Sequence, residues 1–209
     1  MRTPATWWSG IHYNNLMMSV IINDPISPPL QTLDMAKGVF AGAGLINSNK
    51  NIGQLQHLFL DEEARQQMDQ QQPVYRVQAW LPVDEGTTGG LFMGTTWIKP
   101  GLVGDEYFMT HGHFHKLADR GEYYWGLEGK GVLLLMDQQR NTRAEYVYPG
   151  SLHYIPAYTA HRVANIGDTE LSFGACWPSD AGHNYDEIKE RGFSKRLINQ
   201  NGTPTLINA

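Results

Sequence analysis

Residues 110–131 are THGHFHKLADRGEYYWGLEGKG, and this stretch decides which fold and which kind of site the sequence predicts. His113 and His115 are two positions apart, so in a β-strand their side chains share one face, with Cα atoms roughly 6.5–7 Å apart. Imidazoles at that separation can converge on one metal ion, because metal–nitrogen bonds are about 2.0–2.1 Å long. Glu122 follows Gly121, where a hairpin would return its carboxylate to the same pocket. The stretch therefore predicts a metal site between β-strands.

His111 complicates this prediction. It lies two positions before His113, so strand parity alone places its side chain on the same face as the other two histidines. A single histidine in a strand is more often a surface residue or a hydrogen-bonded core residue than a metal ligand. The residues by themselves therefore leave His111 as an alternative ligand.

Short runs of β-branched and aromatic residues dominate the chain from Val74 onward. Gly, Pro or charged turns separate these runs, and no helical pattern lies between them. This texture predicts seven or eight strands in an all-β antiparallel sandwich or closed barrel. The runs are residues 74–83, 91–100, 123–127, 131–136, 144–150, 152–156 and 171–177.

Two helices are predicted outside these runs. Residues 56–72 (QHLFLDEEARQQMDQQQ) have a candidate N-cap in Asp61, two glutamates in the following turn and Pro73 just after the end. Residues 186–196 (DEIKERGFSKR) predict a short, charged helix or turn at the surface.

Composition and charge limit the possible partners. The net charge is -5 and no Lys/Arg cluster is present, so we expect no nucleic-acid partner. The single cysteine, Cys176, excludes an intramolecular disulfide and fits a reducing compartment. The apolar run at 16–22 is too short to span a membrane and precedes no cleavage pattern, so we expect a cytoplasmic protein with no membrane partner. Residues 1–30 are aromatic and Asn-rich, and we expect an N-terminal extension there, followed by one domain over residues 31–209.

The spacing of several further residues resembles the cupin family. Cupins carry His-x-His, a later Glu and a Gly seven residues after it, followed by a second motif, Gly-x5-Pro-x-Gly-x2-His-x3-Asn. The matching residues here are His113, His115, Glu122, Gly129, Gly150, Pro156, His161 and Asn165, with Tyr158 in place of the middle glycine. The resemblance implies a cupin barrel, that is, a double-stranded β-helix or jelly roll with a few short peripheral helices. It also implies the metal ligands His113, His115, Glu122 and His161, and it leaves His111 out.

Longer segments resemble one branch of that family, the cupin-type glucose-6-phosphate isomerases. The motifs T-x-G-H-F-H, P-x-Y-x-A-H-R-x-x-N-x-G-D and D-A-G-H-x-Y are specific to it, and they lie in residues 104–131, 148–168 and 178–185. The resemblance implies interconversion of glucose 6-phosphate and fructose 6-phosphate with one divalent metal ion per chain. Three imidazoles and a carboxylate suit Fe²⁺, Mn²⁺, Ni²⁺ or Zn²⁺, and the family favours Fe²⁺. A homodimer is also implied, with residues 1–30 at its interface.

The same resemblance assigns roles to individual side chains. Glu122 and His183 are the candidate catalytic residues, Glu122 as the base that moves a proton between C2 and C1, and His183 for ring opening or proton shuttling. A metal-assisted hydride shift is the alternative to proton transfer through a cis-enediol. The candidate substrate contacts are Thr96, Thr110, Gly112, Tyr124, Tyr158 and Tyr185. Trp177 stands where the family implies an aromatic hydroxyl near phosphate, and we interpret Lys99 and Arg162 as charges on the rim of the site.

Two other functions fit the same four ligands. One is a metal-dependent dioxygenase, and the other is a sugar-binding or metal-binding cupin without activity. The D-A-G-H-x-Y segment favours the isomerase, because neither alternative has a use for it. The fold alone does not decide, since one fold hosts many functions.

Overall fold

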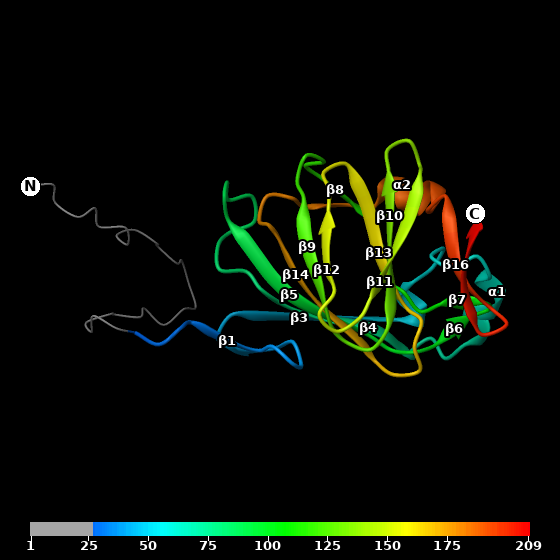
Figure 1. The fold of residues 1–209 in the computed structure, drawn as a ribbon, viewed down its shortest axis with the longest axis horizontal. Coiled ribbons are helices and arrows are strands. Elements are labelled where there is room, and N and C mark those ends of the chain that lie inside the picture. The colour runs from blue at the N-terminus through cyan, green and yellow to red at the C-terminus, as the bar shows by residue number, and fades with distance from the viewer. Residues whose placement is uncertain (1–26) are drawn as a thin grey trace, which may run out of the picture. The chain divides into compact units, whose positions relative to one another are not determined.

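The computed structural model describes residues 27–209, and β-strands make up about half of this part of the chain (Figure 1). The predicted N-terminal extension, residues 1–30, lies almost entirely outside the described residues. Residues Gln31–Ala209 form one unit. Its strands are β1 (Gln31–Asp34), β2 (Val39–Gly42), β3 (Leu45–Asn51), β4 (Pro73–Trp80), β5 (Leu91–Ile98), β6 (Leu102–Val103), β7 (Glu106–Tyr107), β8 (Phe114–His115), β9 (Glu122–Glu128), β10 (Gly131–Asp137), β11 (Thr142–Val147), β12 (Leu152–Ile155), β13 (Thr159–Asn165), β14 (Leu171–Pro178), β15 (His183–Asn184), β16 (Lys195–Gln200) and β17 (Thr203–Asn208).

Two sheets form the barrel. The larger has the strand order β12-β9-β14-β5-β4-β3, and the smaller has the order β11-β10-β13. All pairings within them are antiparallel, and the chain passes from one sheet to the other after β9, β11, β12 and β13. Crossing between two antiparallel sheets in this way is the connectivity of a jelly roll. The all-β barrel of the cupin type is thus confirmed.

Two residues of the cupin motifs stabilise the barrel and are not part of the metal site. Gly129 turns the chain between β9 and β10 at φ 78°, and a Cβ there would lie 2.7 Å from the carbonyl oxygen of Glu170. Asn165 is buried at the end of β13, where its side-chain amide donates to the carbonyls of Ile98 (2.9 Å) and Thr169 (2.8 Å). Glycine is required at the first position because of the positive φ and the close approach. At the second, an amide ties β13 to β5 and to the following turn.

The first predicted helix is much shorter than the sequence indicated. Helix α1 spans Glu62–Gln67, and Asp61 caps it as predicted, since its carboxylate accepts from the amide of Ala64 at 2.8 Å. Residues 56–61 are not helical, and His57 has φ 62°. Leu58 and Phe59 enter the core from this turn, so the apolar residues that suggested a helix face are buried without one.

The C-terminal part also differs from the prediction. Helix α2 spans Asp186–Arg191, whereas Lys195 and Arg196, predicted in or beside the same helix, belong to β16. Strand β16 forms a hairpin with β17 through Asn201 and Gly202, which have φ 53° and 84°. Asn-Gly between two extended runs is a strong hairpin signal that the sequence analysis did not use. In the part of the chain that the structure describes, no helix is long and apolar enough to cross a membrane.

Candidate metal centre

Three histidines meet inside the barrel. His113 and His115 come from the segment that contains β8, and His161 comes from β13. One ring nitrogen of each lies within 4.8 Å of the others. The backbones of His113 and His161 bond to each other in both directions, at 3.3 and 3.1 Å, which fixes the two Cα positions against one another. The structure therefore brings together the histidine pair and the distant histidine that the sequence analysis combined.

Glu122 joins this cluster from the first position of β9. Its Oε1 lies 2.6 Å from Nε2 of His161 and 3.8 Å from Nε2 of His115. Burial raises the pKa of the Glu122 carboxyl, but the neighbouring imidazoles of His161 and His115 lower it more, and the net pKa falls to about 2. The carboxylate therefore stays ionised near neutral pH.

Backbone carbonyls orient two of the imidazoles. Nδ1 of His115 lies 2.8 Å from the carbonyl oxygen of Arg120, and Nδ1 of His161 lies 3.2 Å from that of Thr159. A carbonyl only accepts, so each Nδ1 carries a proton, and each Nε2 points into the cluster as a potential ligand. These carbonyls were missed by the sequence analysis, because a backbone acceptor leaves no signal in residue type.

The ligand atoms have no partners of their own. Among the described residues, four buried atoms of this cluster lack a hydrogen bond, and they are Nε2 of His113, His115 and His161 and Oε1 of Glu122. Buried polar atoms are normally satisfied, and converging acceptors repel one another unless a cation lies between them. A single proton can bridge only one pair, whereas one divalent ion can bind all four atoms. The donor set, with three imidazoles, one carboxylate and no thiolate, therefore fits a catalytic metal ion.

His111 is not part of this cluster of nitrogens. Its ring packs edge-on against Tyr185, with ring centroids 5.2 Å apart. The position is explained by Gly112, which has φ 77° and interrupts the strand, so the alternation that would align His111 with His113 does not apply.

His183 and Tyr185 lie beside the cluster. Strand β15 pairs with β8, with His183 opposite His115, and the His183 ring is 4.4 Å from that of His113. Tyr185 stacks on His183 and lies 5.4 Å from His113. Both residues are exposed and lie beside the histidine cluster.

Three further candidate contacts come from β9, from β5 and from the segment before His113. Tyr124 lies 5.7 Å from the His161 ring, and burial and the charge of Glu122 raise the pKa of its hydroxyl well above the ordinary value. Thr110 is attached to β13, since its Oγ1 accepts from the amide of Val163 at 3.1 Å. Thr96 is buried on β5.

Tyr158 makes no described hydrogen bond or ring contact with these residues. It is half-exposed in the turn between β12 and β13, and its amide donates to the carbonyl of Ala118. Its φ is 61°, in the left-handed region that glycine favours. The tyrosine thus keeps the backbone conformation that the glycine of the cupin motif would adopt.

One interpretation of the charged residues is wrong. Lys99 is half-exposed and pairs with Glu170 at 2.8 Å. Arg162, however, is only 6% exposed. Burial, with Arg196 nearby, lowers the pKa of its guanidinium to about 9. Side chains alternate along β13, so Arg162, which follows the inward-facing His161, points to the other face of the strand. Other segments of the chain cover that face.

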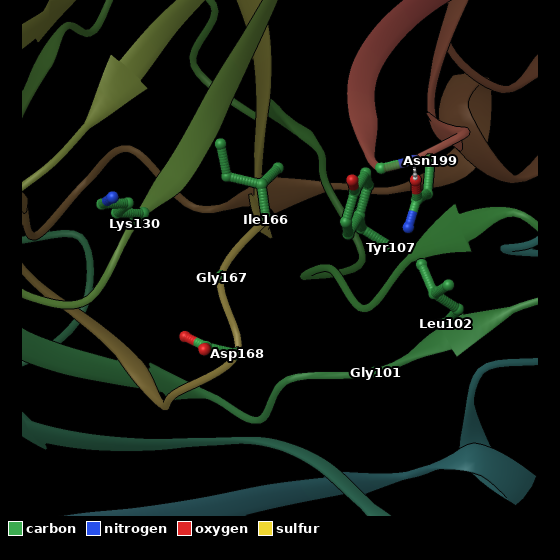
Figure 2. Close-up of a pocket in the computed structure, with 9 residues that line it drawn as sticks. Gly101, Leu102, Tyr107, Lys130, Ile166, Gly167, Asp168 and Asn199 are labelled. Carbon is green, nitrogen blue, oxygen red and sulfur yellow. Dashed lines mark hydrogen bonds between the residues drawn. The ribbon is translucent and has the colours of Figure 1, made fainter.

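A separate cavity of about 440 Å³ contains none of the predicted site residues. It is open to solvent and lies between the β5–β6 connection, the turn after β13 and the β16–β17 turn (Figure 2). Lys130, Asp168 and Asn199 are among the residues around it. The metal centre is therefore indicated by the convergence of its ligand atoms, and this cavity is not part of it.

Comparison with known proteins agrees with the geometry. A family model described as glucose-6-phosphate isomerase (GPI) matches residues 49–207. The chain belongs to the cupin-type glucose-6-phosphate isomerase family. A glucose-6-phosphate isomerase from Thermococcus onnurineus is 40% identical over 176 residues, which cover 84% of this chain and 92% of the relative. The glucose-6-phosphate isomerase of Pyrococcus furiosus is 36% identical over 176 residues, with the same coverage of 84% and 92%.

Among solved structures, the chain is similar to oxalate decarboxylase from Bacillus subtilis. The TM-score is 0.41 and the sequence identity is 20%, over 53% of this chain and 26% of that one. The family is shown by the isomerase relatives and not by this distant likeness.

Proposed function

We propose that this chain interconverts glucose 6-phosphate and fructose 6-phosphate at the metal centre formed by His113, His115, Glu122 and His161. The observation that carries the proposal is the convergence of four buried, unpartnered ligand atoms inside a chain of this family. The family relationship supports the sugar-phosphate substrate and favours Fe²⁺, and the donor set also suits Mn²⁺, Ni²⁺ or Zn²⁺.

The residues around the centre have the properties that the reaction needs. Aldose–ketose isomerisation moves a hydrogen between C2 and C1 and develops negative charge on the adjoining oxygens. A divalent ion held by the four ligands would supply Lewis-acid charge for those oxygens. Glu122, which is ionised, is the proposed base for proton transfer. His183 and Tyr185, which lie beside His113, are proposed to contact the open chain of the sugar and, for His183, to assist ring opening.

Neutral groups are proposed to bind the phosphate and the hydroxyls. Thr110 and Gly112 directly precede the ligand His113, and hydroxyl and amide donors of this kind can hold a phosphate without a contacting arginine. Thr96 and Tyr124 belong to the same proposed set. Tyr158 stays in the set on the family resemblance, although its described contacts join it to Ala118 and not to the histidines.

We also propose a homodimer, formed through the outer face of the larger sheet. Tyr123 and Tyr154 are exposed there with ring centroids 5.2 Å apart, and Leu152 is exposed beside them. Their row continues through Cys176 and Met93 on the neighbouring strands. An exposed apolar row of this kind is typical of an interface, and a second copy of the chain offers a matching surface. Residues 1–30 are proposed to contribute, and the single cysteine supports a cytoplasmic location.

Light scattering on Tyr154→Arg tests the dimer. The expected result is a shift of the wild-type dimer to monomer, and a wild-type monomer would contradict the proposal. Deletion of residues 1–30 should weaken the dimer if that segment contributes.

A coupled assay for glucose 6-phosphate formation, before and after chelation and metal add-back, tests the activity. We expect activity to disappear on chelation and to return with Fe²⁺. Activity that is indifferent to chelation, or absent with every metal, would contradict the proposed function. Incorporation of solvent deuterium at C1 or C2 would support proton transfer by Glu122, and strictly intramolecular transfer would favour the hydride shift.

A further inference from the structure

Arg162 lies directly behind the loop that carries Thr110 and Gly112. Its Nη2 donates to the carbonyl of His111 at 3.1 Å, and its Nη1 contacts Sδ of Met109 at 3.2 Å. The guanidinium lies 4.1 Å from the centre of the Phe193 ring, which supports it from the other side. One side chain therefore connects β13 to two points of the loop.

Gly112 allows the loop to lie directly on this arginine. A Cβ at Gly112 would lie 2.8 Å from Nε and 3.0 Å from Cβ of Arg162, and φ at Gly112 is 77°. The two ends of the loop are also held to β13, since Met109 bridges to Ala164 and His113 to His161. The conformation of the loop is thus set by β13 at both ends and by Arg162 in the middle.

The charge of Arg162 is not neutralised by a contacting carboxylate. Within residues 27–209 no carboxylate oxygen lies within 4.0 Å of it, and Nε is buried without a hydrogen-bond partner. Glu106, an acidic residue nearby, pairs with Arg196 at 2.9 Å instead. The amide of Gly112, which is buried, also donates to no acceptor among the described residues. A buried cation and a buried free donor are both costly, and an anion bound at the loop would offset both.

We propose that Arg162 is a positioning residue for the phosphate group of the substrate. It holds the Thr110–Gly112 loop so that the hydroxyl of Thr110 and the amide of Gly112 face the phosphate, and its own positive charge lies behind them. This inference rests on the proposed function, because it assigns the phosphate end of the same site. Arg162 does not itself touch the reacting atoms, so its removal affects binding of the phosphate more than the chemical step.

The variants Arg162→Met and Arg162→Lys test this, with Lys99→Met as a matched control that removes an exposed cation. We expect Arg162→Met to raise KM for glucose 6-phosphate about tenfold or more while kcat changes less than about threefold. Arg162→Lys keeps the charge but not both contacts, so its KM should lie between those of wild type and Arg162→Met. Metal content should stay at one ion per chain in all variants, and Lys99→Met should keep the wild-type KM.

Calorimetric titration of the metal-free proteins with inorganic phosphate gives a readout that does not depend on activity. The dissociation constant for phosphate should rise in both Arg162 variants and stay unchanged in Lys99→Met. Wild-type values of KM and of this constant in a folded Arg162→Met protein would overturn the inference, and if that variant does not fold, the same criterion applies to Arg162→Lys. A wild-type protein without isomerase activity would instead contradict the proposed function, whatever the phosphate titration shows.

Discussion

Two buried histidines on consecutive strands of the barrel differ in how their ring nitrogens are used. His153 on β12 is 4% exposed, and His161 on β13 is 1% exposed. Both nitrogens of His153 are bonded, Nδ1 to Oε2 of Glu145 at 2.7 Å and Nε2 to Oγ of Ser151 at 2.9 Å. His161 uses only Nδ1, and its Nε2 faces Oε1 of Glu122 at 2.6 Å without a hydrogen bond.

The network around His153 stabilises the fold, whereas the cluster around His161 has free atoms that a ligand can bind. The Glu145–His153–Ser151 network needs nothing from outside the chain, so its contribution is to stability. In the other region, four ligand atoms are left without partners, and each unsatisfied buried atom costs about 1–3 kcal/mol. A site that keeps such a cost is completed by something that the chain does not supply, and we propose that this is a divalent cation.

The largest expected effect comes from removing His161. The change His161→Ala takes away one of the four proposed ligands, so we expect loss of most bound metal and a drop in activity of more than about a hundredfold. Metal analysis of the purified protein and the coupled assay measure the two losses. The matched control is His111→Ala, which should retain its metal. A His161→Ala protein with a full metal complement would show that the ligands are wrongly assigned.

Breaking the other region should cost stability and leave the metal in place. The change His153→Ala leaves Glu145 and Ser151 without their shared partner and creates a cavity, so the free energy of unfolding should fall by about 2–3 kcal/mol. Urea titration of the metal-free protein measures this loss. Ser151→Ala, which removes the bond to His153 and the bond that Oγ accepts from the amide of Tyr148, should cost about 1–2 kcal/mol. Loss of metal from His153→Ala would mean that the two regions are coupled.

Glu122→Gln should give Nε2 of His161 a hydrogen-bond partner, as Nε2 of His153 already has. With Nδ1 of His161 donating to the carbonyl of Thr159, its Nε2 is left as an acceptor. The amide of glutamine can donate to it, so the metal-free variant should be more stable than the metal-free wild type by about 1 kcal/mol. Its metal affinity should fall at least about tenfold, because the charged ligand is lost. Thermal unfolding of both metal-free proteins at pH 9 decides the first point, and a destabilised variant would contradict it.

The smallest effect is expected at Tyr158, in the turn that joins the strands of the two histidines. Its φ of 61° is strained for a side chain with a Cβ, so Tyr158→Gly should stabilise the protein by about 0.5–1 kcal/mol. Asn201→Gly is the matched control, since asparagine tolerates positive φ and should gain less. Tyr158→Gly should keep its metal. A KM close to that of wild type would remove Tyr158 from the proposed substrate contacts.

The sequence predicted the strands that are rich in β-branched and aromatic residues and missed those that are not. Strands β4, β5, β9 to β12 and β14 fall on the predicted runs, whereas β13 (TAHRVAN) is buried but lies in none of them. Strand β3 (LINSNKN) is mostly exposed and polar, and it was not predicted either. The predicted helix over residues 56–72 was too long, because Leu58 and Phe59 are apolar and buried like residues of a helix face but belong to a turn.

The sequence by itself determined the all-β barrel, the family and the set of residues that meet at the metal centre. These follow from local spacing, such as the two-residue step from His113 to His115 and the motif around His161, because strand geometry converts spacing into shared faces. Only the tertiary structure decided that His111 lies outside the cluster and that Arg162 is buried behind the loop. Both depend on the turn at Gly112 and on segments packed from elsewhere in the chain. Burial and the satisfaction of polar atoms are set by distant neighbours, which no local pattern records.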